Sequence, residues 1–260
     1  MQQELNIALV QANLVWENPV QNRINFTEKI NSIITSIDLI VLPEMFTTGF
    51  TMNATEVAET MQGDTVKWMK SMAEKSNAAL VGSIIILENN NFFNRLLFVH
   101  PNGTIETYDK RHTFTLAGEG KVYQAGKEKL IITYKDWKIC PLVCYDLRFP
   151  VWARNVEDYD ILLYVANWPK PRIAAWDALL KARAIENMSY CVGVNRVGLD
   201  AANYEYTGSS AVYDVLGEKI SSITLSKEQT EVITLKKSHI NKYRDKLQFL
   251  NDKDSFNLEV

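Results

Sequence analysis

The chain has 260 residues, of which 47% are hydrophobic and 23% charged, and its net charge is −3. This is the composition of an ordinary soluble globular protein. Lys and Arg form no long run, so we do not expect nucleic acid as the main partner. No stretch approaches the roughly 18 apolar residues of a membrane span, and the first residues lack the pattern of a signal peptide. We therefore expect neither secretion nor membrane association.

In the first half of the chain, short segments rich in Val, Ile and Leu alternate with segments of helical pattern. Strands are predicted at residues 5–11, 38–43, 79–87 and 95–101. Helices are predicted at residues 19–35 and 63–76. The turn sequence PNGT, at residues 101–104, predicts a hairpin connection.

The second half of the chain continues the same alternation. Strands are predicted at residues 138–144, 160–167, 190–196, 209–214 and 231–235, and helices at residues 149–157 and 173–188. The turn sequence YKDW, at residues 134–137, predicts a second hairpin connection. Proline cannot donate a hydrogen bond to a neighbouring strand, so Pro141 predicts an edge position or a bulge.

The order of these elements predicts an α/β fold. Some strands are separated by helices and others by tight turns, which indicates a mixed sheet covered by helices. So many strands favour two packed sheets over one open sheet. The sequence has no repeat, linker or low-complexity segment, and we expect one domain over residues 1–260.

Three strongly apolar segments end in a polar residue: Glu44, Cys144 and Asn167. Ligand sites in α/β proteins gather at the carboxyl ends of strands. If these three strands are neighbours, a carboxylate, a thiol and an amide meet at one place. The alternative is that each strand simply stops at a polar residue.

Cys144 has several interpretations. A disulfide with Cys140 is disfavoured, because four strand steps span about 13 Å while bridged Cα atoms lie within about 7 Å. Three cysteines and three scattered histidines are a poor set for a zinc site, so we expect no metal. An inert buried thiol suits Cys140 and Cys191, which lie inside apolar segments. It suits Cys144 less well, because Tyr-Asp-Leu-Arg follows directly. The few cysteines favour a reducing cytoplasm.

A reactive cysteine needs a base or a nearby cation, because the pKa of a free thiol is about 8.5. His112 lies in YDKRHTF, close after Lys110, so a Cys–His pair is one solution. Glu44 as base, with Lys110 as cation, is the other.

Three motifs together resemble those of the nitrilase superfamily of carbon–nitrogen hydrolases. They are PEMFTTGF at residues 43–50, YDKRHTF at residues 108–114 and CYDLRFP at residues 144–150. NWP at residues 167–169 and FLNDKDSF at residues 249–256 are similar to the omega-amidase branch, and ARAIEN at residues 182–187 resembles a superfamily helix. The resemblance implies a four-layer α-β-β-α sandwich that forms a homodimer.

The resemblance also implies the roles of individual residues. Glu44 would be the general base, Cys144 the nucleophile that forms a thioester, and Lys110 the electrophilic cation. Glu119, in AGEGK, matches a further acidic residue of the family. The oxyanion would be held by the lysine and by the backbone N–H of Tyr145. The family needs no metal or organic cofactor.

For the substrate, the resemblance points to the terminal amides of short 2-oxo dicarboxylic acids, such as 2-oxoglutaramate and 2-oxosuccinamate. The pocket should then hold a cation for the substrate carboxylate, and Arg148 and Arg172 are the candidates. A salt bridge of Arg148 with Asp146 or Glu157 is an equal alternative. Phe50, Phe114 and Trp168 are candidates for an aromatic pocket wall, and plain packing in the core is an equal alternative. A sibling hydrolase acting on another amide, a carbamoyl compound or a nitrile is the alternative function.

Overall fold

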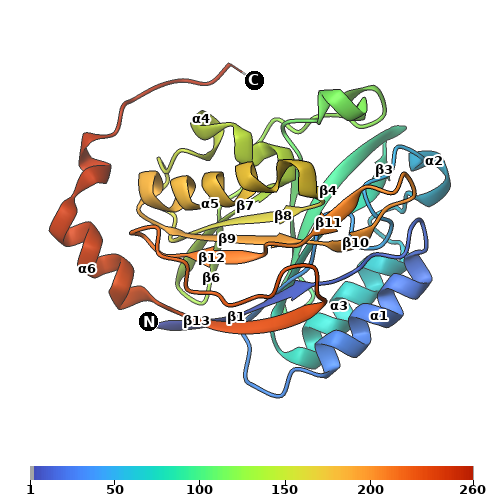
Figure 1. Ribbon diagram of the computed structural model, residues 1–260, viewed down its shortest axis with the longest axis horizontal. Helices are drawn as coiled ribbons and strands as arrows, with labels where there is room; N and C mark the ends of the chain where they lie inside the picture. The colour runs from blue at the N-terminus through green and yellow to red at the C-terminus, as the bar shows by residue number, and fades with distance from the viewer. Residues whose placement is uncertain (1–2, 260) are drawn as a thin grey trace.

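Two β-sheets form the centre of the protein in the computed structural model, which describes residues 3–259 (Figure 1). The six-stranded sheet has the order β13-β1-β2-β3-β4-β5. Its strands are β1 (Glu4–Gln11), β2 (Leu39–Val41), β3 (Ala79–Glu88), β4 (Asn91–Val99), β5 (Ile105–Asp109) and β13 (Gln229–Lys236). The five-stranded sheet has the order β12-β9-β8-β7-β6. Its strands are β6 (Ile132–Tyr134), β7 (Trp137–Val143), β8 (Ile161–Ala166), β9 (Tyr190–Asn195) and β12 (Ala211–Tyr213).

Both sheets are mixed, as the sequence predicts. In the six-stranded sheet β1, β2 and β3 run parallel, and antiparallel strands flank them on both sides. In the five-stranded sheet β7, β8 and β9 run parallel between the antiparallel strands β6 and β12. A two-stranded ribbon of β10 (Val197–Leu199) and β11 (Glu205–Thr207) lies outside both sheets. The carboxyl ends of β2, β7 and β8 therefore carry the three polar residues noted in the sequence.

Helices cover the outer face of each sheet. The six-stranded sheet is covered by α1 (Pro19–Asn31) and α3 (Asp64–Ser76), whose buried residues pack with Ile40 and Leu80. The five-stranded sheet is covered by α5 (Ile173–Asn187), and the short helix α4 (Pro150–Ala153) lies nearby. Between the sheets lies a core to which both contribute, for example through Ile7 of β1 and Ile139 of β7. The predicted four-layer α-β-β-α sandwich is thus confirmed.

Two local predictions about β7 are confirmed. Lys135 and Asp136 join β6 to β7, and both have positive φ (48° and 66°), which fits the twist of a two-residue hairpin. Pro141 pairs with Leu163 of β8, but the pairing of β7 with β6 stops at Ile139. The second half of β7 therefore lies at the sheet edge, where a missing N–H costs no ladder hydrogen bond.

Other predictions of element boundaries were wrong. The helix expected at residues 149–157 is only α4, because the backbone of Asn155 bonds instead to the side chain of Asn187. The helix expected to reach residue 35 ends at Asn31, before three β-branched residues (33–35), which have low helix propensity. The sequence analysis missed α2 (Ala54–Val57) and α6 (Lys237–Leu247), and it also missed the short strands β5, β6, β10 and β11.

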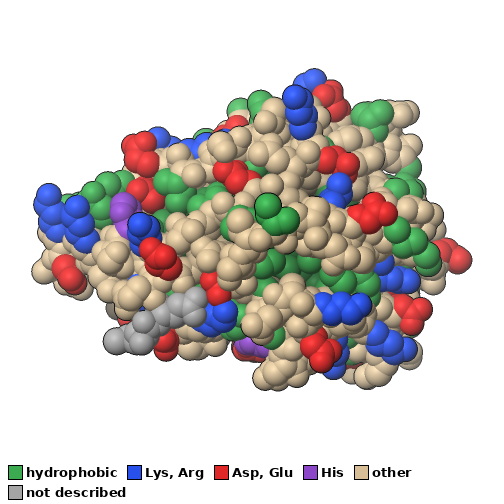
Figure 2. Space-filling model, turned by 90° about the horizontal axis from the view of Figure 1, so that it is seen from below, with side chains coloured by type: hydrophobic (Ala, Val, Ile, Leu, Met, Phe, Trp, Pro, Cys, Tyr) green, Lys and Arg blue, Asp and Glu red, His purple; other side chains and the backbone are tan. Residues whose placement is uncertain are grey.

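The surface carries no single-sign patch on the face shown in Figure 2, where Lys, Arg, Asp and Glu are interspersed. Within residues 3–259, no helix combines the length and apolar character needed to cross a bilayer. The helix α6 projects from the body, and the segment that follows it extends beyond α4 in the view of Figure 1.

Candidate active site

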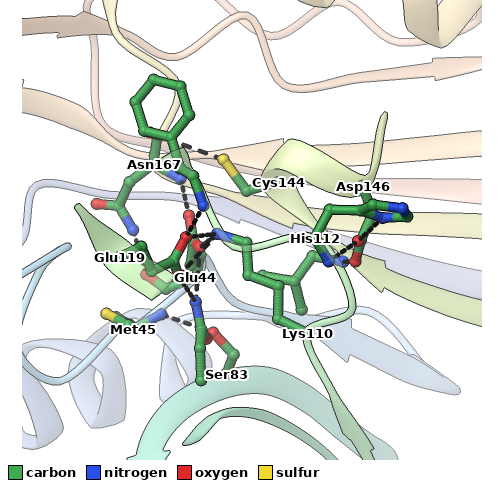
Figure 3. A network of polar contacts seen from close by, with 12 residues as sticks. Glu44, Met45, Ser83, Lys110, His112, Glu119, Cys144, Asp146 and Asn167 are labelled. Atoms are coloured by element: carbon green, nitrogen blue, oxygen red, sulfur yellow. Dashed lines mark hydrogen bonds and ion pairs between the residues drawn. The ribbon is translucent and has the colours of Figure 1, made fainter. Parts of the chain in front are cut away.

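The ends of β2, β7 and β8 meet at one place, which was one of the two alternatives left open by the sequence (Figure 3). The backbone N–H of Asn167 donates to Oε2 of Glu44 at 2.8 Å. The side-chain amide of Asn167 donates to the backbone oxygen of Glu44 at 2.5 Å. The carbonyl oxygen of Asn167 lies 3.9 Å from Sγ of Cys144. The carboxylate, the thiol and the amide therefore belong to one site.

Lys110, which follows β5, lies between two carboxylates. Its Nζ donates to Oε1 of Glu44 at 2.9 Å and to the two carboxylate oxygens of Glu119 at 3.0 Å and 2.9 Å. All three side chains are at most 1% exposed. Charges are retained at such depth only when they are paired and hydrogen-bonded, so the three groups form one electrostatic unit.

Asn94 is a member of this cluster that the sequence analysis missed. It lies within β4, and its Nδ2 donates to Oε1 of Glu44 at 2.8 Å and to Oε1 of Glu119 at 3.3 Å. The N–H of Phe114 completes the bonding of Glu119, at 2.5 Å. The sequence signal was weak, because Asn94 is one of three polar residues in β4, with Asn91 and Arg95. The amide of Asn94 bridges the two carboxylates that contact the lysine.

Burial and charge set the protonation of the cluster. Burial raises the pKa of the Cys144 thiol well above its ordinary value, and the adjacent Glu44 acts in the same direction more strongly than Lys110 opposes it. Burial alone would lower the pKa of Lys110, but Glu119 and Glu44 together raise it above its usual range. Burial also raises the pKa of Glu119, an effect that Lys110 partly offsets. The resting site therefore holds a cationic lysine and a neutral thiol that needs a base.

Cys144 lies at a sharp turn from strand to helix. It begins the 3₁₀ helix η3 (Cys144–Arg148) directly after β7, and its φ is +45°. A left-handed conformation of a residue other than glycine costs about 1–3 kcal/mol and persists where the surrounding structure enforces it. The residue is 9% exposed, and its side chain lines a pocket.

The pocket above Cys144 has a volume of about 300 Å³. The expected substrate-binding residues Phe50, Phe114, Arg148, Trp168 and Arg172 all line it, together with Lys110 and Tyr145. The guanidinium of Arg148 lies 4.8 Å from the centre of the Trp168 ring. That of Arg172 lies 5.1 Å from the centre of the Phe114 ring. Two arginines thus line the pocket, each with its guanidinium over an aromatic ring.

Other residues that line the pocket were not predicted from the sequence. Trp16, Met52, Asp200, Tyr204 and Tyr206 also line it. They come from the segments after β1 and β2 and from the β10–β11 ribbon, which the sequence analysis did not single out. Their position depends on how distant segments meet, which no local pattern records.

Two alternatives left open by the sequence are wrong. His112 does not face Cys144, because its Nδ1 lies 2.8 Å from Oδ1 of Asp146. Arg148 has no salt bridge with Asp146 or Glu157: Asp146 pairs with His112, and Glu157 pairs with Lys129 at 2.8 Å. Of the two proposed bases, only Glu44 is placed beside the thiol.

Among residues 3–259, His, Cys, Asp and Glu form no group of three or more that could hold a metal ion.

Comparison with known proteins gives a consistent result. The family described as carbon-nitrogen hydrolase matches residues 6–245. The omega-amidase YafV of Escherichia coli is 44% identical over 254 residues, covering 98% of each chain. The 2-oxoglutaramate amidase of Bacillus subtilis is 31% identical, covering 83% of this chain and 85% of its own.

A solved structure is similarly close. XC1258 from Xanthomonas campestris, a CN-hydrolase superfamily protein with an arsenic adduct in its active site, superposes with a TM-score of 0.97. It is 41% identical, and the match covers 99% of this chain and all of that one. The motifs, the four-layer fold and the family match agree, and the chain belongs to the carbon–nitrogen hydrolase family.

Proposed function

We propose that this enzyme is an omega-amidase, which hydrolyses the terminal amide of short 2-oxo dicarboxylic acid monoamides to the acid and ammonia. The observation that carries the proposal is the placement of Cys144 beside Glu44 and Lys110, at the floor of a small pocket whose wall holds two arginines. The similarity to an omega-amidase and to a 2-oxoglutaramate amidase supports the same substrate class.

In the first half of the reaction, Glu44 takes the thiol proton and Sγ of Cys144 attacks the amide carbonyl carbon. The carbonyl π electrons move to oxygen. Lys110 and the N–H of Tyr145 stabilise this oxyanion, and loss of one such donor typically costs about 2.7–4 kcal/mol. When the C–N bond breaks, Glu44 returns its proton to nitrogen, and ammonia leaves. The enzyme then holds a thioester.

In the second half, water attacks the thioester carbonyl and loses its proton to Glu44. The C–S bond breaks, the sulfur regains the proton, and the carboxylic acid is released. Glu119 acts with Lys110, because its two oxygens hold the ammonium in place at 2.9 Å and 3.0 Å. Glu44 thus serves as base and as acid in both halves of the reaction. This is efficient when the proton affinity of the carboxylate suits the operating pH.

Substrate recognition is assigned to the arginines of the wall. Arg148 and Arg172 are stacked on Trp168 and Phe114, which leaves their guanidinium edges to bind a carboxylate in bidentate fashion. The pocket of about 300 Å³ suits a short chain between the amide and that carboxylate. Phe50, whose ring centre lies 5.1 Å from Nζ of Lys110, closes the side next to the cluster.

A substrate panel tests the proposal. Ammonia release is measured with 2-oxoglutaramate, 2-oxosuccinamate, succinamate, a ureido acid and a short nitrile. We expect the highest kcat/KM for the two 2-oxo acid monoamides. The alternative is a sibling hydrolase, and it is favoured if a nitrile or ureido acid turns over well while the monoamides are ignored.

The thioester has its own test. Intact mass is measured after a slow substrate is mixed with enzyme and quenched in acid. We expect an adduct of the acyl group on the peptide that contains Cys144. An adduct on Cys140 or Cys191, both of which are fully buried, would contradict the mechanism.

The homodimer and the cytoplasmic location belong to this proposal. The dimer rests on the resemblance to the nitrilase superfamily, and Val151 of α4 and Ile185 of α5 are exposed hydrophobic side chains in the single chain. Sedimentation equilibrium should give twice the chain mass, and a monomer at micromolar concentration would contradict the dimer. All three cysteines are free thiols, which suits a reducing compartment.

A further inference from the structure

Asp146 lies two residues after Cys144 and has an unusual number of hydrogen-bond partners. It is fully buried, and its carboxylate accepts four hydrogen bonds. Each of these partners lies within two residues of Cys144 or Lys110, the nucleophile and the cation of the proposed chemistry.

On the nucleophile side, Oδ2 of Asp146 accepts the N–H of Val143 at 3.0 Å. The side chain thus reaches back over Cys144 and Tyr145 and closes the turn from β7 to η3. Cys144 has its φ of +45° inside this closed turn. Such strained backbone persists where neighbouring bonds enforce it, and this hydrogen bond spans the strained residue directly.

On the lysine side, the same carboxylate holds both flanks of Lys110. Its Oδ2 accepts the hydroxyl of Tyr108 at 2.8 Å. Its Oδ1 accepts the backbone N–H of His112 at 2.9 Å, and Nδ1 of the same residue lies 2.8 Å away (Figure 3). Tyr108 precedes the lysine by two residues and His112 follows it by two. One group therefore contacts the chain on both sides of the cation.

These contacts are themselves held in place. The ring of His112 stacks on Phe149 with ring centres 3.6 Å apart and planes at 4°. The hydroxyl of Tyr108 accepts Nε1–H of Trp152 at 3.0 Å, so its own proton is directed to Asp146. Burial and the negative charge of Asp146 raise the pKa of Tyr108, which keeps that proton on the hydroxyl.

We infer that Asp146 is a positioning residue that sets the geometry between Cys144 and Lys110, by fixing the strained turn of the nucleophile and both flanks of the lysine. This inference rests on the proposed function. It assigns Asp146 no contact with substrate; the residue acts through the two that do. Because displacement of reacting groups by about 1 Å can cost about 10²-fold in rate, the effect on turnover should be large.

The principal test is Asp146→Asn. The amide keeps the size of the carboxylate but presents N–H to two of the four donors. We expect kcat to fall on the order of 10²-fold with KM within about threefold of wild type, since positioning for the transition state is lost while the pocket remains. Alkylation of Cys144 by iodoacetamide, followed by intact mass, should also change in rate. That assay needs no substrate, so its outcome is independent of the omega-amidase assignment.

Asp160→Asn is the matched control. Asp160 is also a buried carboxylate, and it accepts the backbone N–H of Lys138 at 2.9 Å and bonds to Lys237, at the opposite end of β7. It should lower the Tm but leave kcat and the alkylation rate as in wild type.

Tyr108→Phe removes only one of the four bonds, and we expect kcat to fall about three- to tenfold. If Asp146→Asn does not fold, the kcat of Tyr108→Phe tests the positioning role instead. The inference is overturned if folded Asp146→Asn keeps the wild-type kcat and the wild-type alkylation rate. If that variant cannot be obtained, a wild-type kcat in Tyr108→Phe overturns it. Failure of the wild-type enzyme to hydrolyse 2-oxoglutaramate would instead refute the proposed function.

Discussion

The buried cluster and the pocket wall hold their charges in different ways. In the cluster, Lys110 bonds to Glu44 and Glu119 at about 3 Å, and all three side chains are inaccessible. In the wall, Arg148 and Arg172 lie on aromatic rings, and among residues 3–259 neither is part of an ion pair. The charged groups of the cluster are paired with one another inside the protein, whereas the wall leaves donors for a ligand. This difference separates the groups assigned to bond breaking from those assigned to recognition.

The largest effect is expected from Cys144→Ala. Removal of the nucleophile should lower kcat by at least about 10⁴-fold, because the thioester pathway is lost. Turnover of 2-oxoglutaramate is measured together with the far-UV circular dichroism spectrum and the Tm. The spectrum should match that of wild type. Unchanged turnover would contradict the mechanism.

Lys110→Met should affect both rate and stability, because it breaks the cluster itself. Loss of an oxyanion donor should lower kcat about 10²–10³-fold. Two buried carboxylates would lose their cation, which typically costs about 3–5 kcal/mol. Urea unfolding measures the second effect. Arg172→Met is the matched control from the wall, and it should lower stability by less than about 1 kcal/mol. Equal losses of stability in the two variants would remove the distinction between cluster and wall.

Arg148→Gln should act on binding more than on chemistry. We expect KM for 2-oxoglutaramate to rise about tenfold, with kcat within about threefold, because a charge-assisted bond to the carboxylate contributes about 1.5–3 kcal/mol. A neutral amide substrate of the same length serves as comparison, because it has no carboxylate for Arg148 to bind. The same rise of KM for both substrates would show that Arg148 supports the pocket rather than binding the anion.

The smallest effect is expected from Cys140→Ala, which lies four residues from the nucleophile and outside the pocket lining. Burial raises the pKa of Cys140 to about 12, so the folded protein keeps this proton where the unfolded chain loses it. Its contribution to stability is therefore present below the unfolded pKa, about 8.5, and is lost as pH rises towards 12.

Urea unfolding between pH 8.5 and 10.5 measures the contribution of Cys140 to the free energy of unfolding. The loss of stability per pH unit should be smaller in Cys140→Ala than in wild type, by up to about 1.4 kcal/mol at the upper end of this range. The kcat of the variant at pH 7.5 should stay within about twofold of wild type. If the free energy of unfolding falls equally with pH in the two proteins, ionisation of Cys140 does not affect stability and the prediction is wrong. A large fall in kcat would contradict the inert role of this thiol.

The sequence predicted part of the site from strand ends and the rest from its resemblance to the nitrilase superfamily. Glu44, Cys144 and Asn167 each follow a strongly apolar segment, and strand ends can be recognised from local hydrophobic pattern. The same pattern missed α6, whose narrow apolar face has only Ile240, Tyr243 and Leu247, and of these Ile240 alone is buried. The single domain, the homodimer and the roles of the site residues stay predictions.

By itself, the sequence determined the layers of the fold, the carboxylate, lysine and thiol of the cluster, and the family to which the chain belongs. Only the tertiary structure decided that Glu44, and not His112, lies beside the thiol, that Asn94 joins two carboxylates, and that Asp146 spans both sides of the site. The reason is physical. Hydrophobic periodicity reports which face of a segment is buried, whereas the partner of a buried polar group depends on the register and packing of segments far apart in the chain.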